Sequence, residues 1–139
     1  KDWAMPITTS LFQRIGNRWL RNTAGTWSAT VYLALYKSSP SLDGTGGTEF
    51  TTADFTIYAR QPISIGAPSG RVFTNDSAAL FTTSATMGTP ATATYYAIFT
   101  AITGGTMDAY TALTSPLLIG ASTPVNFPVG SLTFSDAGS

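Results

Sequence analysis

FTAITGGTMDAYTAL, residues 99–113, is the stretch that decides the fold. Its adjacent glycines, Gly104 and Gly105, stand between hydroxyl residues as they would in a phosphate-binding loop. Such a loop needs a strand before it, a helix after it and usually a Lys. No Lys or Arg follows Val72, and the residues on both sides of the glycines alternate with a period of two. Glycine reaches the positive φ of hairpin turns, so the stretch predicts two antiparallel strands with a structural turn at Gly104 and Gly105.

Outward from this hairpin, short segments with the same period and turn signals between them predict strands over about residues 27–135. Pro62 cannot donate to a strand ladder, which predicts an edge strand or a bulge there. The pattern is typical of an all-β fold, an antiparallel β-sandwich or jelly roll. Alternation predicts a core in which the following residues face one another between sheets: Val31, Leu33, Leu35, Ala97, Phe99 and Leu132.

One short N-terminal helix is predicted over about residues 9–21, capped by Thr9 or Ser10 and closed by Asn22. Its apolar residues form one stripe that must bury against its own sheet or a neighbour's: Leu11, Phe12, Ile15, Trp19 and Leu20. The opposite face carries Arg14, Arg18 and Arg21. Arginine pairs with carboxylates at interfaces, which makes these three a speculative assembly contact, although a helix face with three Arg is usually a solvated face.

The composition argues against several classes of function. Seven basic residues balance seven acidic ones and only 10% of residues are charged, so we expect neither nucleic acid nor membrane as a partner. The low charge indicates a surface covered by neighbours, or else a neutral surface rich in Thr and Ser. The absence of His and Cys removes the commonest general base and the commonest metal ligands, so no catalytic residue, metal or cofactor is expected.

Domain organisation is simple. No composition shift divides the chain, so residues 5–139 are expected to form a single β-sandwich domain. Residues 1–4 precede Met5, and we interpret them as an addition to the native chain, the alternative being a processed natural terminus. The Gly-rich loop over residues 38–54 has little to bury and is expected to be mobile.

Two further groups of residues are candidates for a binding or catalytic site. Asp43, Glu49 and Asp54 in or beside the Gly-rich loop could form a calcium or acid/base cluster, but their order is not that of a calcium loop, which favours solvated charges. Tyrosine pairs could form a sugar-stacking face, although Tyr is also a good strand former, which favours a structural role. The candidate pairs are Tyr32 with Tyr36 and Tyr96 with Tyr110.

The order of segments from Leu11 to Phe134 resembles a family of small virion proteins of tailed bacteriophages, the phage tail fibre or minor tail proteins. In character it is similar to capsid-decorating cement proteins. The pieces that carry the resemblance are Gly46-Gly47-Thr48-Glu49, Tyr58-Ala59-Arg60-Gln61, and Ala97-Ile98-Phe99 leading to Gly104-Gly105. The chain departs from the pattern in lacking a Trp before the hairpin.

The resemblance implies a non-catalytic structural protein located in the virion, tail-associated or capsid-decorating. Such a protein would self-associate as a homo-oligomer and dock on other virion proteins. The alternative is a carbohydrate- or receptor-binding module whose partner is a host-surface glycan, because sandwich folds serve both roles.

Overall fold

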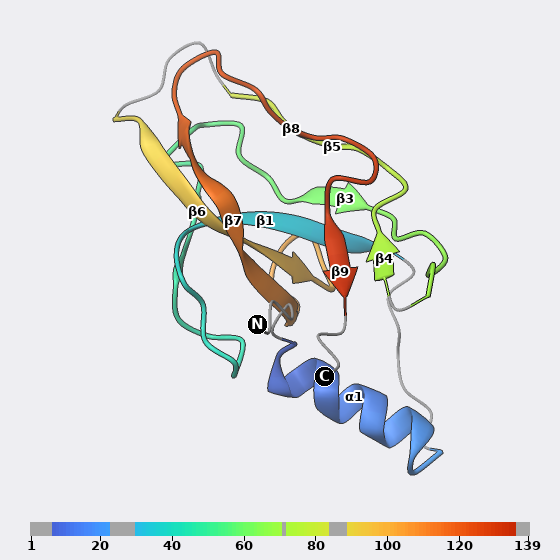
Figure 1. The fold of residues 1–139 in the computed structure, drawn as a ribbon. Coiled ribbons are helices and arrows are strands. Elements are labelled where there is room, and N and C mark those ends of the chain that lie inside the picture. Colours follow the sequence, from blue (N-terminus) through green and yellow to red (C-terminus); the bar gives the residue numbers. More distant parts are fainter. Residues whose placement is uncertain (1–6, 23–29, 71, 84–88, 136–139) are drawn as a thin grey trace.

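Three long antiparallel strands, β1 (Val31–Ser38), β6 (Ala91–Phe99) and β7 (Met107–Ile119), form the centre of the fold in the computed structural model (Figure 1). The structure describes residues 7–22, 30–70, 72–83 and 89–135. β6 lies between β1 and β7, and the far edge of β1 pairs with two short strands, β2 (Thr48–Glu49) and β3 (Gln61–Ile63). Pro62 lies in β3 opposite Tyr32, which confirms the predicted edge position.

Two small ladders cover one face of this sheet. β5 (Ala79–Phe81) pairs with β8 (Val125–Phe127), and β4 (Val72–Thr74) pairs with β9 (Thr133–Ser135). Side chains of the β5–β8 ladder pack in one cluster with those of β1 and β6. The predicted all-β sandwich with one short helix is therefore confirmed.

The central sheet buries apolar side chains on both faces, and this corrects the predicted core. Leu33, Leu35 and Leu132 lie in the main cluster beneath the ladders, with Val31 at its margin. Ala97 and Phe99 are buried on the opposite face. The prediction was wrong by one residue in β6, because Ile98 rather than Ala97 lies opposite Leu33. Side chains alternate strictly between faces, so a one-residue slip moves the whole set to the other side.

The second cluster is covered by the N-terminal segment and by the loop that follows β1. It consists of Ala34, Tyr36, Ala97, Phe99, Met107 and Tyr110. A Cβ at Gly44 would lie 3.7 Å from the Cβ of Met107, and one at Gly47 would lie 3.0 Å from the ring of Tyr36. The loop therefore packs closely over this face.

The expectation that residues 38–54 have little to bury is wrong. Phe50 is 1% exposed and lies in the main core, next to Phe55, which is 2% exposed. The loop is turn-rich as predicted, with Gly44, Gly46 and Gly47 all at positive φ.

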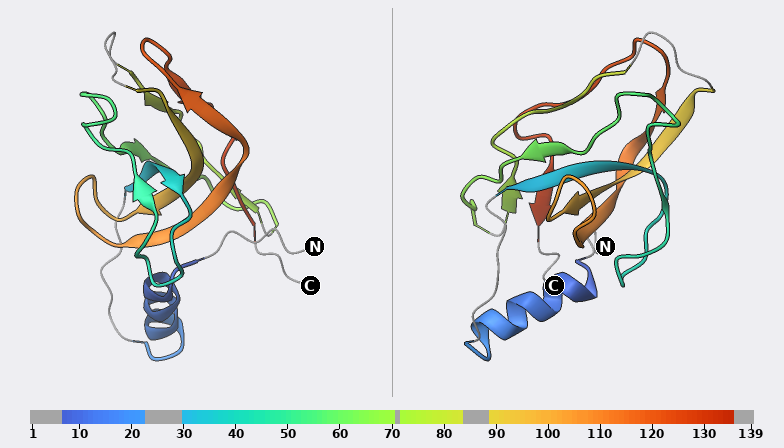
Figure 2. Two further views of the ribbon diagram at one scale, coloured as in Figure 1. Left: turned by 90° about the vertical axis from the view of Figure 1, so that its left-hand side faces the viewer. Right: turned by 180° about the vertical axis from the view of Figure 1, so that it is seen from behind.

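Helix α1 (Thr9–Trp19) lies below the sheet, as both views of Figure 2 show. Thr8 caps it, in place of the predicted Thr9 or Ser10. The helix ends two residues earlier than predicted, with Leu20 as its C-cap and Asn22 at a φ of 49°. The predicted strand residues 27–29 lie outside the described part of the chain. No helix in that part is long and apolar enough to cross a membrane.

Candidate assembly surface

Thr8 fixes the start of α1 to the sheet. Its side chain is fully buried, accepts a hydrogen bond from the backbone N of Leu11 at 3.3 Å and donates one to the carbonyl of Met107 at 2.6 Å. Its backbone N donates to the carbonyl of Asp108 at 2.9 Å. On the other side, the backbone N of Thr9 donates to the carbonyl of Leu42 at 2.8 Å. These bonds set the direction of the helix relative to β7 and the loop.

Arg14 makes an ion pair within the chain. Its Nη1 donates to Oδ1 of Asp108 at 2.5 Å, and the two side chains are 25% and 10% exposed. Burial raises the pKa of Asp108 above its usual value, while the positive charge of Arg14 acts in the opposite direction. The pair therefore holds α1 against β7, one and a half turns into the helix.

The structure separates the three arginines that the sequence placed together. Arg14 faces the body of its own chain, whereas Arg18 and Arg21 are exposed. Arg21 also donates to Oδ1 of Asn17 at 3.1 Å, one turn back along the helix. Arg18 and Arg21 thus lie at the outer end of α1, where a partner could reach them.

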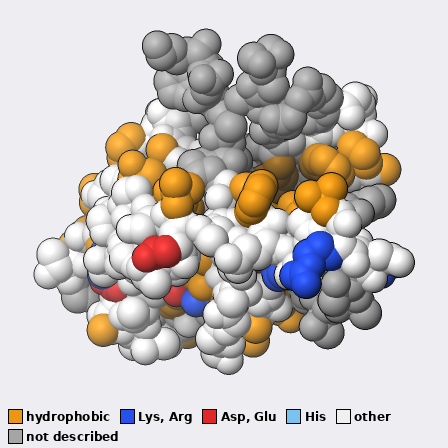
Figure 3. Space-filling model, turned by 90° about the horizontal axis from the view of Figure 1, so that it is seen from below, with side chains coloured by type: hydrophobic (Ala, Val, Ile, Leu, Met, Phe, Trp, Pro, Cys, Tyr) orange, Lys and Arg blue, Asp and Glu red, His pale blue; other side chains and the backbone are white. Residues whose placement is uncertain are grey.

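Three residues of the apolar stripe of α1 are exposed to solvent. Phe12 is 67% exposed, Ile15 37% and Leu20 89%. Seen from below, the molecule shows hydrophobic side chains spread across this face, with acidic and basic side chains among them (Figure 3). A shallow groove of about 420 Å³ runs along the helix where Gly16 leaves a gap between Phe12 and Leu20.

The three sequence pieces that carry the resemblance meet at Arg60. Its guanidinium forms two hydrogen bonds of 2.8 Å to the carboxylate of Glu49, one to each oxygen. Its Nη1 also donates to the carbonyls of Ala101 at 3.1 Å and Gly104 at 2.7 Å. Arg60 therefore ties β2 to the hairpin between β6 and β7. Arginine suits this place because its planar fork can donate in several directions at once.

Gly104 and Gly105 lie in that hairpin connection, at φ values of 61° and 69°. The connection spans residues 100–106, and the backbone N of Thr100 donates to the carbonyl of Thr106 at 3.0 Å across it. It is wider than a two-residue turn, and two of its carbonyls accept hydrogen bonds from Arg60. Both glycines adopt the left-handed backbone that favours this residue.

Glu49 also orders the tyrosines around it. The hydroxyl of Tyr58 donates to Oε1 of Glu49 at 2.9 Å and accepts from the backbone N of Leu35 at 3.2 Å. Burial, with the charge of Glu49, raises the pKa of Tyr58 and raises that of Tyr36 to about 12. Burial acts to lower the pKa of Arg60, but the hydrogen bonds and charge of Glu49 outweigh it and raise the pKa.

The other loop carboxylates have local partners. Asp43 accepts from the backbone N and the hydroxyl of Thr45, and Asp54 accepts from Lys37 at 2.7 Å and from the backbone N of Thr51 at 2.8 Å. In the part of the chain that the structure describes, no group of acidic side chains could hold a metal ion. Asp43, Glu49 and Asp54 thus make separate contacts and do not form the calcium or acid/base cluster that the sequence offered as an alternative.

The tyrosine pairs do not form an exposed stacking face. Tyr36, Tyr96 and Tyr110 are all less than 10% exposed, and each lies in one of the two cores. The structural role that the sequence favoured for them matches these positions.

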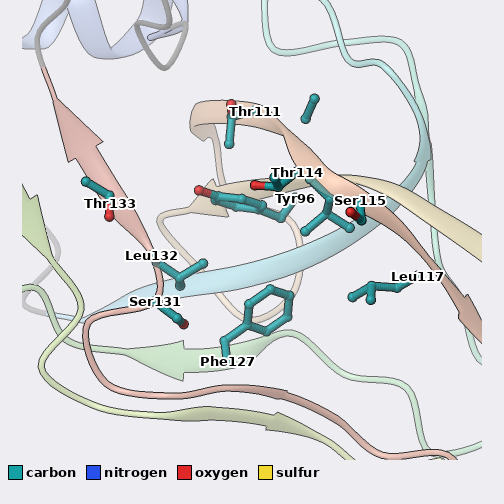
Figure 4. Close-up of a pocket in the computed structure, with 11 residues that line it drawn as sticks. Tyr96, Thr111, Thr114, Ser115, Leu117, Phe127, Ser131, Leu132 and Thr133 are labelled. Atoms are coloured by element: carbon teal, nitrogen blue, oxygen red, sulfur yellow. The ribbon is translucent and has the colours of Figure 1, made fainter.

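An open hollow of about 840 Å³ lies beside β7. Ala93 pairs with Leu117 and Tyr95 with Ala112, so residues 113–116 of β7 bulge outward opposite a single residue of β6. Figure 4 shows the aromatic rings of the lining at the base of the hollow and hydroxyl side chains around it. The aromatic residues are Tyr96 and Phe127, and the hydroxyl residues are Thr111, Thr114, Ser115, Ser131 and Thr133.

Comparison with known proteins gives one result that covers nearly the whole chain. No curated protein matches the sequence. The family model described as Podophage GP4 fiber I protein gp80 matches residues 6–135, a span that includes α1, the Glu49–Arg60 pair and every strand. The chain therefore belongs to this family of phage tail fibre proteins, and it is a component of the virion.

Proposed function

We propose that this virion protein is a non-catalytic structural subunit that self-associates and docks on other proteins of the particle. The exposed apolar face of α1 is the observation that carries the proposal. Phe12 and Leu20 are 67% and 89% exposed, although an amphipathic helix normally buries this face. Contiguous exposed apolar surface marks a site of protein interaction.

The way α1 is held supports the same function. The bonds of Thr8 and the Arg14–Asp108 pair attach one side of the helix to β7, so the apolar side is presented in a fixed orientation. A prearranged surface loses less conformational entropy on binding than a segment that must first fold. With only 10% of residues charged, such a surface can be covered without removing many ions from water.

Co-sedimentation tests the proposal. Purified protein is mixed with particles that lack it, and the bound amount is measured after pelleting. We expect wild type to bind at a fixed stoichiometry and the double variant Phe12→Ser with Leu20→Ser to remain in the supernatant. Leu118→Ser is a matched control, because Leu118 has the same 67% exposure as Phe12 but lies on β7.

Thermal unfolding of all three proteins must accompany the binding measurement. The replaced side chains are mostly exposed, so their loss should leave the melting temperature nearly unchanged. Full binding by the double variant would rule out the α1 face as the docking surface.

The hollow beside β7 supports a second candidate, the recognition of a host-surface glycan. Its exposed hydroxyl side chains, those of Thr114, Ser115 and Ser131, can make the hydrogen bonds that a sugar requires. Retention on an immobilised host polysaccharide tests it. Ser115→Trp, which narrows the hollow, should abolish retention, while Thr52→Trp in an exposed loop should not.

A further inference from the structure

The exposed stripe of α1 is symmetrical about Gly16. Phe12 and Leu20 lie four residues before and after it, so the three positions form one ridge along the helix. A Cβ at Gly16 would meet nothing within 4 Å. The ridge therefore has a large apolar side chain at each end and a gap in the middle, open to the approach of another backbone.

Opposite charges lie at the two ends of this ridge. Arg18 and Arg21 are exposed at the C-terminal end. At the N-terminal end, Thr9 binds the carbonyl of Leu42, and this places the exposed Asp43 beside the first turn. Hydrogen bonds from the side chain and backbone of Thr45 hold the carboxylate of Asp43 and lower its pKa. Figure 3 shows both kinds of charge on this face.

We propose that two copies of the chain pair through α1, with the helices antiparallel about a two-fold axis that passes near Gly16. This inference rests on the proposed self-association and names its surface. In this arrangement Phe12 of each copy packs against Leu20 of the other, and the two Gly16 positions let the backbones approach closely. Asp43 of each copy comes near Arg21 of the other, so the contact is self-complementary, as a two-fold interface must be.

A second copy fits this face better than an unrelated acidic protein does. Residues 9–22 contain three arginines and no acidic residue. Because the exposed arginines lie at the C-terminal end of the helix, a partner must bring carboxylates to that end only. The second copy brings Asp43 to that end and an apolar ridge of equal length to the middle. Phe12 and Leu20 are about 12 Å apart along the axis, so each ridge matches the other when the helices are reversed.

Disulfide trapping tests the geometry, because the chain contains no native Cys. Gly16→Cys lies on the proposed axis, where the two sulfur atoms can meet, and should give a covalent dimer under mild oxidation. Leu20→Cys is the matched control. Its symmetry mate lies roughly 12 Å away along the helix, beyond the 4.4–6.8 Å between Cα atoms that a disulfide bridges. Efficient cross-linking of Leu20→Cys with none of Gly16→Cys would overturn the antiparallel arrangement.

Sedimentation equilibrium of substituted proteins gives an independent readout. Gly16→Gln fills the gap, and its Cβ meets nothing within 4 Å, so it should weaken dimerisation at least tenfold while the melting temperature stays the same or rises. Asp43→Lys and Arg21→Asp should each weaken the dimer. Combined in one chain they restore opposite charges across the interface, so the double variant should recover affinity.

The outcomes separate the two proposals. A wild type that remains monomeric at millimolar concentration overturns both self-association and this interface. If the wild type dimerises, Gly16→Gln dimerises with the same affinity and Gly16→Cys does not cross-link, then the chain self-associates but not through α1. If the protein is monomeric but binds other virion proteins through Phe12 and Leu20, the docking function stands and the two-fold pairing is wrong.

Discussion

The guanidinium carbon of Arg60 lies 3.4 Å from the centroid of the Phe99 ring. The same guanidinium binds both oxygens of Glu49 and two carbonyls of the hairpin, so it is held on every side. A charge held between an aromatic face and a carboxylate is favourable only when its hydrogen bonds are complete. Arg60 comes close to that condition, with four hydrogen bonds from its five N–H donors, so the region from β2 to the hairpin should depend on it.

Replacing Arg60 by Met should therefore lower the free energy of unfolding by about 3–5 kcal/mol, because it leaves Glu49 without its cation and two hairpin carbonyls without their donor. Urea denaturation measures the change. Arg18→Met, at an exposed position, should cost less than about 0.5 kcal/mol. Adding Glu49→Gln to Arg60→Met should recover part of the loss, since no unpaired carboxylate then remains. Strict additivity of the two substitutions would contradict the coupling.

The register of β6 can be tested with core substitutions. Phe99→Ala should cost roughly 3–5 kcal/mol, because Phe99 is 6% exposed in the second cluster. Ile98 and Leu33 face each other in the main core, so Ile98→Ala and Leu33→Ala should be non-additive. Phe99→Ala and Leu33→Ala lie on opposite faces and should add. Coupling in the second pair and not in the first would show that the register is wrong.

The two hairpin glycines should differ in their tolerance of alanine. A Cβ at Gly105 would lie 2.9 Å from the Cβ of Ala101 and from Oγ1 of Thr100, whereas one at Gly104 would meet nothing within 4 Å. Gly104→Ala should cost about 1–2 kcal/mol for its left-handed backbone alone, and Gly105→Ala more than that. Denaturation midpoints measure both, and equal costs would mean that the inner side of the turn can relax.

Asp108 and Asp54 should affect stability with opposite dependence on pH. The pKa of Asp108 is raised in the folded state, so the folded chain binds more protons and its contribution falls as pH rises from about 3.9 through the folded pKa. Although burial acts to raise the pKa of Asp54, the hydrogen bonds from Lys37 and Thr51 outweigh it and lower that pKa. Its contribution is present above about pH 3.9 and is lost as pH falls through the folded pKa.

Unfolding free energies of wild type, Asp108→Asn and Asp54→Asn between pH 2 and 7 separate the two effects. The difference between wild type and Asp108→Asn should decrease as pH rises, and that between wild type and Asp54→Asn should increase. The same slope for both variants would contradict one of the two assignments.

Docking should depend on salt through the exposed arginines. Arg18→Glu with Arg21→Glu should reduce binding to particles and remove most of its salt dependence, because exposed charges are screened over about 8–10 Å. Arg14→Glu is unsuitable for this purpose, since it places two carboxylates together at Asp108 and perturbs the fold. If the double variant binds at full stoichiometry with unchanged salt dependence, the two arginines form only a solvated face.

Local pattern predicted the strands well but could not choose between the two faces of the sheet. β6 is apolar on both sides, with Ala97 and Phe99 on one and Tyr96 and Ile98 on the other, so alternation alone permits either register. The capping residue of α1 was similarly ambiguous. Three hydroxyl residues stand in a row at its start, and the contact of Thr8 with Met107, distant in sequence, selects the first of them.

The cluster around Arg60 had no signal in spacing or charge. Glu49 precedes it by 11 residues, and the carbonyl of Gly104 follows it by 44. Its members did stand out together as the sequence pieces that resemble the phage family. That resemblance indicates common ancestry and does not show that the residues are in contact. The exposed stripe of α1 was visible in the sequence, but only the fold shows that β7 leaves it uncovered.

The long sequence separation around Arg60 bears on how the chain folds. The β6–β7 hairpin joins neighbours in sequence and can form early, whereas Arg60 must arrive from 44 residues away to bind its inner side. Closing a loop of this length costs conformational entropy before the contact is made, so we expect the Arg60 contacts to form late in folding. Weakening the Arg60 cluster should then speed unfolding while leaving the rate of folding almost unchanged, which would make this cluster a determinant of how long the assembled protein survives.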